Sequence, residues 1–300
     1  MYSLEQKLEE AARLVKKTSS LQQHTDHSGT LPVGVGFINW GANIDASIVA
    51  IEKYRPCAVW LFGPRDFPND LIPLVEQVRK MTSGRTRIWV QLGSVPEAIS
   101  AVETLRPDVL VVQGSDAGGH GLARSASVIS LVPEVSDALG KGGAAPAILA
   151  SGGIADGRGV AACLALGASG VAMGTRFLAS REATIARGYQ DEVLRASDGG
   201  SSTVRSTVYD HVRGISSWPA RYNGRGVINR TYLDAVEGQM ANQENKRLYE
   251  EEVKKGDLGW GPAGRLTTYA GTGVGLIKDV LPAADIIGKI LEDARGILSL

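Results

Sequence analysis

Short apolar runs recur along the first 180 residues, and segments with helical periodicity separate them. The runs are rich in valine and isoleucine and nearly continuous in hydrophobicity, with little alternation between apolar and polar residues. This pattern is typical of strands in a parallel sheet that helices cover on both faces. The strands predicted on this basis cover residues 32–38, 58–62, 87–92, 109–113, 147–151 and 170–173.

Helices are predicted between these strands and before the first of them. They cover residues 4–16, 46–54, 71–81, 96–105, 131–139 and 159–166. Strand–helix units with such short connections imply right-handed parallel crossovers. A (β/α)8 barrel of the TIM type and an open doubly wound sheet both meet this requirement, and both gather ligand-binding residues at the carboxyl ends of the strands.

Two glycine turns follow the last two predicted strands. The first is Ser151-Gly152-Gly153, and the second is Gly174-Thr175-Arg176. Backbone N–H groups in such turns, helped by a helix N-terminus, can surround a phosphate group. Barrel enzymes often bind phosphate after strands seven and eight, so the turns favour the barrel. We therefore predict an α/β fold of the TIM-barrel type, incomplete at six strands. No GxGxxG motif opens the first strand, which favours a phosphomonoester such as FMN over a dinucleotide.

The stretch VLVVQGSDAGGHG, residues 109–121, carries the strongest catalytic candidate, His120. Glycines on both sides remove side chains around the imidazole and let the backbone approach a planar ligand. Histidine is well suited to proton transfer near neutral pH. At the end of the strand, Gln113 can both donate and accept hydrogen bonds, as the polar edge of a heterocycle requires. Asp116 either orients this loop or His120, or shapes the bend as an Asx turn.

Composition excludes several function classes. The chain has 32 basic and 32 acidic residues, so we expect no nucleic acid and no membrane surface as a partner. We also expect no membrane span, no secretory signal and a cytoplasmic location. Cys57 and Cys163 lie in apolar runs and are predicted to be free thiols. His24 and His27 are predicted to lie in a polar loop with Asp26, and no metal site is predicted. The sequence contains no GxSxG motif, which is the nucleophile motif of many serine hydrolases, so this class of enzyme is not indicated.

The strand pattern stops after the second glycine turn. Helices are predicted at 182–195 and 231–255, with a Gly/Ser break at 198–202 and a turn-rich segment, SSWPARYNGRG, at 216–226. We therefore predict three parts. Residues 1–180 supply the barrel strands and the phosphate site, residues 181–262 form a helical subdomain beside the ligand-binding face, and residues 263–300 end in a helix, 275–298, that packs back on the barrel.

On these motifs the chain resembles the nitronate monooxygenase family, which are FMN-dependent TIM-barrel enzymes. QGSDAGGHG resembles the family's loop with the catalytic histidine, and ASGGIADGRG and MGTRF resemble its two phosphate-binding turns. YAGTGVGLI, residues 269–277, resembles its late glycine segment near the flavin. The likeness extends over essentially the whole chain from about residue 30 and includes WPARYNGRG.

The resemblance implies that His120 acts as the catalytic base or positions the nitronate. The cofactor-binding residues that it implies are Gln113, Gly118, Gly119, Ser151, Gly152, Gly153, Gly174, Thr175 and Gly271. The implied reaction oxidises an alkyl nitronate with FMN and O₂ to a carbonyl compound and nitrite. Partners would then be a nitronate or nitroalkane and O₂, and a homo-oligomer is compatible with the sequence.

Two departures from the family pattern stand out. Asp116 replaces the usual glutamate, and the family's first two strands, the first with an Ala-Pro-Met segment, have no counterpart in the sequence. We therefore expect an enzyme that lacks the first two barrel strands. Two alternatives stay open at this point. One is a flavin-dependent enoyl reductase, since that group shares the AGGH loop, and the other is a truncated, non-catalytic flavin-barrel paralogue.

Overall fold

The computed structural model describes residues 3–140 and 145–299. The chain forms two compact units: residues 1–111 with 138–147, and residues 112–137 with 148–300. The strands of the main sheet follow the order β1-β2-β3-β4-β6-β7. The boundary between the units falls within β4 (Val109–Gln113).

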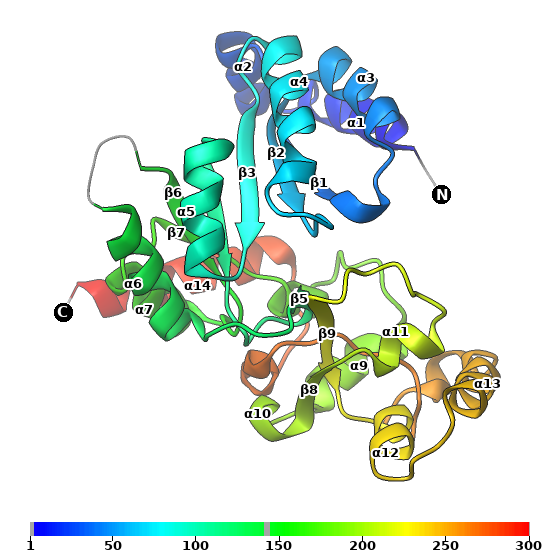
Figure 1. Ribbon diagram of the computed structural model, residues 1–300. Helices are drawn as coiled ribbons and strands as arrows, with labels where there is room; N and C mark the ends of the chain where they lie inside the picture. Colours follow the sequence, from blue (N-terminus) through cyan, green and yellow to red (C-terminus); the bar gives the residue numbers. More distant parts are fainter. Residues whose placement is uncertain (1–2, 141–144, 300) are drawn as a thin grey trace. The chain divides into compact units, whose positions relative to one another are not determined.

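The first unit consists of strands alternating with helices (Figure 1). Its strands pair in parallel, β1 with β2 and β2 with β3. The strands are β1 (Leu31–Ile38), β2 (Pro56–Phe62) and β3 (Arg87–Leu92); the helices are α1 (Leu4–Val15), α2 (Ser19–Ser28), α3 (Ile44–Tyr54), α4 (Ile72–Thr82) and α5 (Val95–Thr104).

Sharp local signals bound these helices, and their apolar faces cover the sheet. The Asn43 side chain caps α3 by accepting from the Ala46 N–H at 3.1 Å, and Ser94 caps α5 in the same way. Val59, Ile88 and Val90 in the strands are completely buried. The apolar runs are therefore strands, as predicted. The expected cover on both faces is not uniform, because burial alternates along β3 and β1 has exposed positions such as Ile38.

The second unit contains the glycine turns. β6 (Ala147–Ser151) and β7 (Gly170–Ala172) pair in parallel, and α6 (Val128–Leu139), α7 (Gly157–Ala165) and α8 (Thr175–Leu178) accompany them. The last helix, α14 (Ala283–Leu298), packs against α7. Their approach is close at Gly157, where an added Cβ would lie 2.5 Å from the Asp293 Cβ and 2.8 Å from the Ile290 carbonyl oxygen.

A second, antiparallel sheet of three strands has the order β5-β9-β8, and the strands run side by side in Figure 1. Its strands are β5 (Gly119–Leu122), β8 (Thr203–Ser206) and β9 (Tyr222–Val227). The sequence pattern predicts only helices and turns between residues 181 and 262. Both strands in this range are short, β9 contains two glycines, and β9 pairs with β5 about a hundred residues earlier in the chain, so no local periodicity reveals them.

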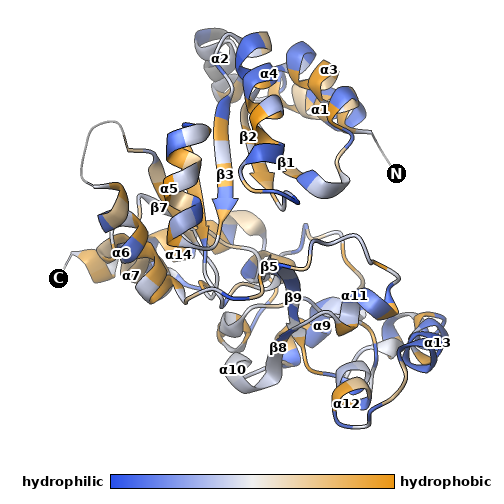
Figure 2. Cartoon of the chain, viewed as in Figure 1, coloured by the Kyte–Doolittle hydropathy of each residue, from blue (hydrophilic) through white to orange (hydrophobic). Residues whose placement is uncertain are grey.

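Helices make up most of the remaining part of this unit. They are α9 (Arg187–Arg195), α10 (Gly199–Ser202), α11 (Val208–Val212), α12 (Arg230–Val236) and α13 (Asn242–Val253). Hydrophilic residues cover most of α13 (Figure 2). The predicted helix at 231–255 is therefore two helices. The predicted division of the chain into three parts at residues 180 and 262, with a helical subdomain over 181–262, stays a proposal.

One further expectation about local structure is wrong. The segment around His24 and His27 is helix α2 and not a polar loop, and the His27 Nδ1 lies 2.7 Å from the Gln23 carbonyl oxygen. The helix ends at Gly29, which adopts the left-handed conformation that glycine favours.

Candidate functional site

His120 lies on a strand and not in the loop that the sequence predicted. β5 pairs with β9 in an antiparallel register that places His120 opposite Gly224. An added Cβ at Gly224 would lie 2.6 Å from a ring carbon of Tyr269. Gly224 therefore leaves room for an aromatic ring on the face of the sheet that carries the imidazole.

A buried carboxylate holds the imidazole. The His120 Nε2 lies 3.0 Å and 2.9 Å from the two carboxylate oxygens of Asp210, on α11. The side chains are only 12% and 5% exposed. The Tyr269 hydroxyl donates to the Asp210 Oδ1 at 2.9 Å. A carboxylate in this position fixes both the orientation of the ring and the nitrogen that carries the proton.

Two aromatic rings enclose the imidazole. Trp218 stacks on it with ring centroids 4.0 Å apart and planes 5° from parallel. Tyr269 lies 5.3 Å away, tilted by 57°. Burial is the main cause that raises the pKa of Tyr269, and the Asp210 carboxylate raises it further. The tyrosine hydroxyl therefore stays protonated and continues to donate to Asp210.

The opposite face of the small sheet carries two arginines. Gly119, Arg225 and Arg205 are paired across the three strands and so share a face, while His120 points to the other. Arg205 donates to the carbonyl oxygens of Ser115, Ala117 and Asn223 at 3.0–3.1 Å. Arg225 donates to the same Ser115 oxygen at 3.1 Å. The two side chains thus hold the turn that precedes His120.

These guanidinium groups are buried cations. Burial lowers the pKa of Arg205 to about 10, and repulsion from Arg225 adds to this while Asp116 opposes it. Burial also lowers the pKa of Arg225. Within residues 3–140 and 145–299, neither side chain forms an ion pair with a carboxylate. Backbone carbonyl oxygens therefore stabilise both charges, and the Asp116 carboxylate offsets part of them at longer range.

Backbone contacts without intervening side chains join this turn to the late glycine segment. An added Cβ at Gly118 would lie 2.5 Å from the Gly271 nitrogen, and one at Gly271 would lie 2.5 Å from the Asp116 carbonyl oxygen. The Thr272 N–H and hydroxyl donate to the Asp116 carbonyl and carboxylate oxygens at 2.9 Å and 3.0 Å. Asp116 therefore orients the loop through Thr272, and does not contact His120 directly in the described hydrogen bonds.

The two predicted phosphate turns converge on the same segment. The Gly271 N–H donates to the Thr175 Oγ1 at 3.0 Å, and an added Cβ at Gly273 would lie 2.5 Å from the Gly153 carbonyl oxygen. Gly152 and Gly153 have φ values of 114° and 75°, which only glycine adopts readily. The late segment thus links the turn after β6 to the turn after β7.

Unpaired amides make these turns suitable for an anion. In the described part of the chain, the N–H groups of Gly152, Gly153, Gly174 and Thr175 donate to no protein acceptor. An added Cβ at Gly174 would meet no atom within 4 Å. Free donors in two neighbouring turns, with open space beside Gly174, can surround a phosphate group, so the residues present fit a phosphate-bearing cofactor.

Gln113 and Ser151 have structural partners near these turns. The Gln113 Nε2 donates to the His120 carbonyl oxygen at 3.0 Å, and the Gln113 side chain occupies the space left by Gly121. The Ser151 carbonyl oxygen accepts from the Gly114 N–H at 2.8 Å. Gln113 therefore connects the end of β4 to the strand that carries the histidine.

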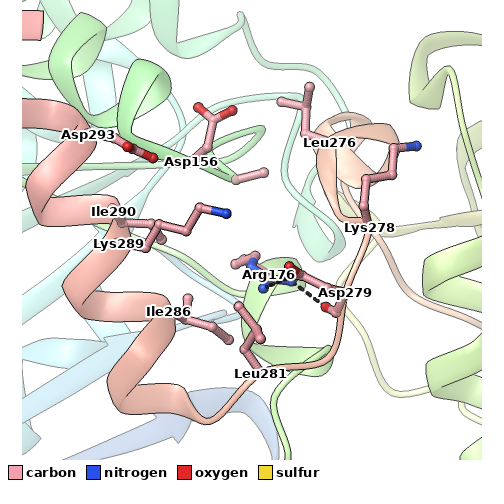
Figure 3. Close-up of a pocket in the computed structure, with 11 residues that line it drawn as sticks. Asp156, Arg176, Leu276, Lys278, Asp279, Leu281, Ile286, Lys289, Ile290 and Asp293 are labelled. Atoms are coloured by element: carbon pink, nitrogen blue, oxygen red, sulfur yellow. Dashed lines mark hydrogen bonds and ion pairs between the residues drawn. The ribbon is translucent and has the colours of Figure 1, made fainter.

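A pocket of about 180 Å³ lies beside the second turn (Figure 3). Its buried charge is Arg176, which donates to the carboxylate and carbonyl oxygens of Asp279 at 2.7 Å and 2.9 Å. Lys278 and Lys289, which also line it, are exposed. Arg176 is therefore fully engaged in anchoring the turn to the segment before α14.

The described residues carry neither a candidate metal site nor a helix that could span a membrane. No group of three or more His, Cys, Asp or Glu side chains is arranged to hold a metal ion there. None of the helices described is long and apolar enough to cross a membrane.

Comparisons with known proteins place the chain in a family. Residues 67–293 match the family described as nitronate monooxygenase. The nitronate monooxygenase npaC of Metarhizium robertsii is 49% identical over 97% of this chain and 81% of that protein. A nitronate monooxygenase of Neurospora crassa is 37% identical over 84% of this chain and 67% of that protein.

A solved structure shows the same fold. FabK from Thermotoga maritima superposes with a TM-score of 0.65 at 24% identity, covering 96% of this chain and 83% of that one. The predicted TIM-barrel-type α/β class is confirmed. Fold and relatives together define a flavin-dependent oxidoreductase. The chain belongs to the nitronate monooxygenase family.

Proposed function

We propose that this protein is an FMN-dependent nitronate monooxygenase that uses O₂ to oxidise alkyl nitronates to carbonyl compounds and nitrite. The observation that carries the proposal is the convergence of two turns with unpaired N–H groups on the segment that also packs against the His120 turn. The 49% identity to npaC, itself described as a nitronate monooxygenase, supports the substrate class.

In this proposal the flavin phosphate is held by the amides of the two turns. The cofactor-binding residues would be Gln113, Gly118, Gly119, Ser151, Gly152, Gly153, Gly174, Thr175 and Gly271. When bound, the flavin supplies the electron chemistry between substrate and O₂. The protein's own residues supply position and proton control.

His120 is the proposed catalytic residue. Its imidazole is held by Asp210 and Trp218, both from the region 181–262, so this region would form one wall of the active site. With a nitronate, His120 positions the anion. With a neutral nitroalkane, it accepts the proton from the carbon next to the nitro group.

Flavin content and nitrite formation test the proposal. The purified protein should be yellow and release FMN on denaturation, and it should form nitrite from propionate 3-nitronate in air. A protein that takes up no FMN from excess solution would contradict the cofactor. NADH oxidation with an enoyl thioester, without turnover of a nitronate, would instead support an enoyl reductase.

A His120→Asn variant tests the catalytic residue. It should keep its FMN but lose about 10²–10⁴-fold in turnover of a nitroalkane that must be deprotonated. Unchanged turnover in the FMN-loaded variant would remove His120 from the mechanism.

A further inference from the structure

The hydrogen bond between His120 and Asp210 distinguishes the two nitrogens of the imidazole. Nε2 lies within 3.0 Å of both Asp210 carboxylate oxygens. An ionised carboxylate only accepts, so Nε2 must carry the hydrogen. Nδ1 has no hydrogen-bond partner among the residues that the structure describes. In the neutral ring, Nδ1 is therefore the unprotonated nitrogen that can accept a proton.

The carboxylate is itself held in place. Asp210 is 4% exposed and lies on α11, and its Oδ1 also accepts the Tyr269 hydroxyl at 2.9 Å. A buried carboxylate is costly unless donors surround it, and here a phenol and an imidazole supply them. Tyr269 thus keeps the acceptor oxygens directed at His120.

Rotation of the imidazole is restricted on both sides. Trp218 stacks on one side of the ring at 4.0 Å, and Tyr269 lies 5.3 Å away at a steep tilt. A 180° flip of the ring would place Cε1 where Nε2 now lies and so break the bond to Asp210. Bringing Nδ1 to Asp210 would require the whole side chain to change its χ1 rotamer, which would displace the stack with Trp218. The arrangement therefore presents one nitrogen to Asp210 and leaves the other for a ligand.

We propose that Asp210 is a positioning residue that holds His120 in the Nε2-protonated form, so that Nδ1 is the base for neutral nitroalkanes, with Tyr269 orienting Asp210. The assignment rests on the proposed function. In the step, the C–H bond next to the nitro group breaks and its electron pair forms the C=N bond of the nitronate. The proton moves to Nδ1, while Nε2–H remains bonded to Asp210.

The discriminating experiment compares a neutral nitroalkane with its preformed nitronate. In the FMN-loaded Asp210→Asn protein, turnover of the nitroalkane should fall at least 100-fold, in the range of lost general-base catalysis. Turnover of the nitronate, which needs no deprotonation, should fall less than about fivefold. Asp210→Glu, which keeps the carboxylate, should recover part of the nitroalkane activity.

Asp234→Asn is the matched control. Asp234 is a similarly buried aspartate in the same unit, but it pairs with Arg230 and Arg265 and does not contact His120. This variant should leave the ratio of nitroalkane to nitronate turnover unchanged. Equal losses on both substrates in Asp210→Asn, or nitroalkane turnover within threefold of wild type, would overturn the proposal.

A second measurement does not depend on activity. Nitrogen-15 NMR of histidine-labelled protein should show His120 with Nε2 protonated and Nδ1 unprotonated, with the signal assigned from the His120→Asn spectrum. The opposite tautomer would overturn the assignment of Asp210. If the NMR result holds and no nitronate is turned over, the proposed function fails while the tautomer assignment stands.

Discussion

Thr272 is bonded twice to Asp116: its hydroxyl donates to the carboxylate Oδ1 at 3.0 Å and its N–H donates to the carbonyl oxygen at 2.9 Å. Replacing the Asp116 side chain removes the bond to its carboxylate and leaves the bond to its carbonyl oxygen. Asp116→Ala should lower the free energy of unfolding by about 1–2 kcal/mol. Asp116→Asn keeps an acceptor oxygen and should lower the free energy of unfolding by less. Denaturant unfolding of both variants measures this difference. Equal losses would mean that the charge, and not the bond to Thr272, matters.

Two glycines of the proposed cofactor site should respond in opposite ways to alanine. At Gly118 the new Cβ would lie 2.5 Å from backbone atoms of Ala270 and Gly271, so the fold should lose about 3 kcal/mol or more. At Gly174 the new Cβ meets no protein atom within 4 Å. Gly174→Ala should therefore keep the apoprotein's stability and weaken FMN binding, as flavin fluorescence titration would measure. Unchanged FMN affinity in Gly174→Ala would contradict the phosphate assignment.

Removal of Arg205 should destabilise the protein because several carbonyl oxygens then lose their donor. Arg205→Met removes this donor from the Ala117 and Asn223 carbonyl oxygens, while the Ser115 oxygen keeps its bond from Arg225, and we expect a loss of about 3 kcal/mol. Arg158→Met is the control. That side chain is 71% exposed, so solvent screens its pairing with Asp156 and its removal should change the stability much less. Chemical unfolding that gives similar losses for both would argue against the role of Arg205.

Tyr189 should make stability fall at high pH. Burial raises its pKa from 10 to about 12, although its bond to the Tyr269 carbonyl oxygen opposes this. The folded state therefore keeps a proton that the unfolded state loses between about pH 10 and 12, so the unfolding free energy falls as pH rises through that window. The stability that the protonated Tyr189 hydroxyl contributes is fully present below about pH 10. Tyr189→Phe should show a shallower decline over the same range, and equal slopes would contradict it.

The parallel strands could be predicted from the sequence because their signal is local. The strands predicted at 87–92, 109–113 and 147–151 match β3, β4 and β6 in the structure. The buried residues of each run, such as Ile88 and Val90 in β3, make it apolar without reference to its partner strand. The glycine turns after β6 and β7 could be found for the same reason, since their motif lies within a few residues.

The partners of His120 could not be predicted, because they are brought in by non-local pairing. Asp210 lies on a five-residue helix with no motif, and it meets His120 only because β8 and β9 pair beside β5. Arg225 and Trp218 do lie in the turn-rich segment that resembles the family. The role of Arg225 depends on which face of β9 it occupies, and that of Trp218 on the path of the loop before β9. A segment predicted only as turns determines neither.

The register of β5 on β9 has a consequence for folding. A slip of one residue would turn the imidazole of His120 toward the face that holds the two guanidinium groups, and would turn a glycine toward the aromatic rings. At Gly121 an added Cβ would already lie 3.0 Å from an Arg205 nitrogen and 2.7 Å from the Gln113 side-chain oxygen, so a ring has no room there. Volume and charge together thus discriminate against the mispaired chain, and the glycines beside His120 contribute to the fidelity of folding before any ligand arrives.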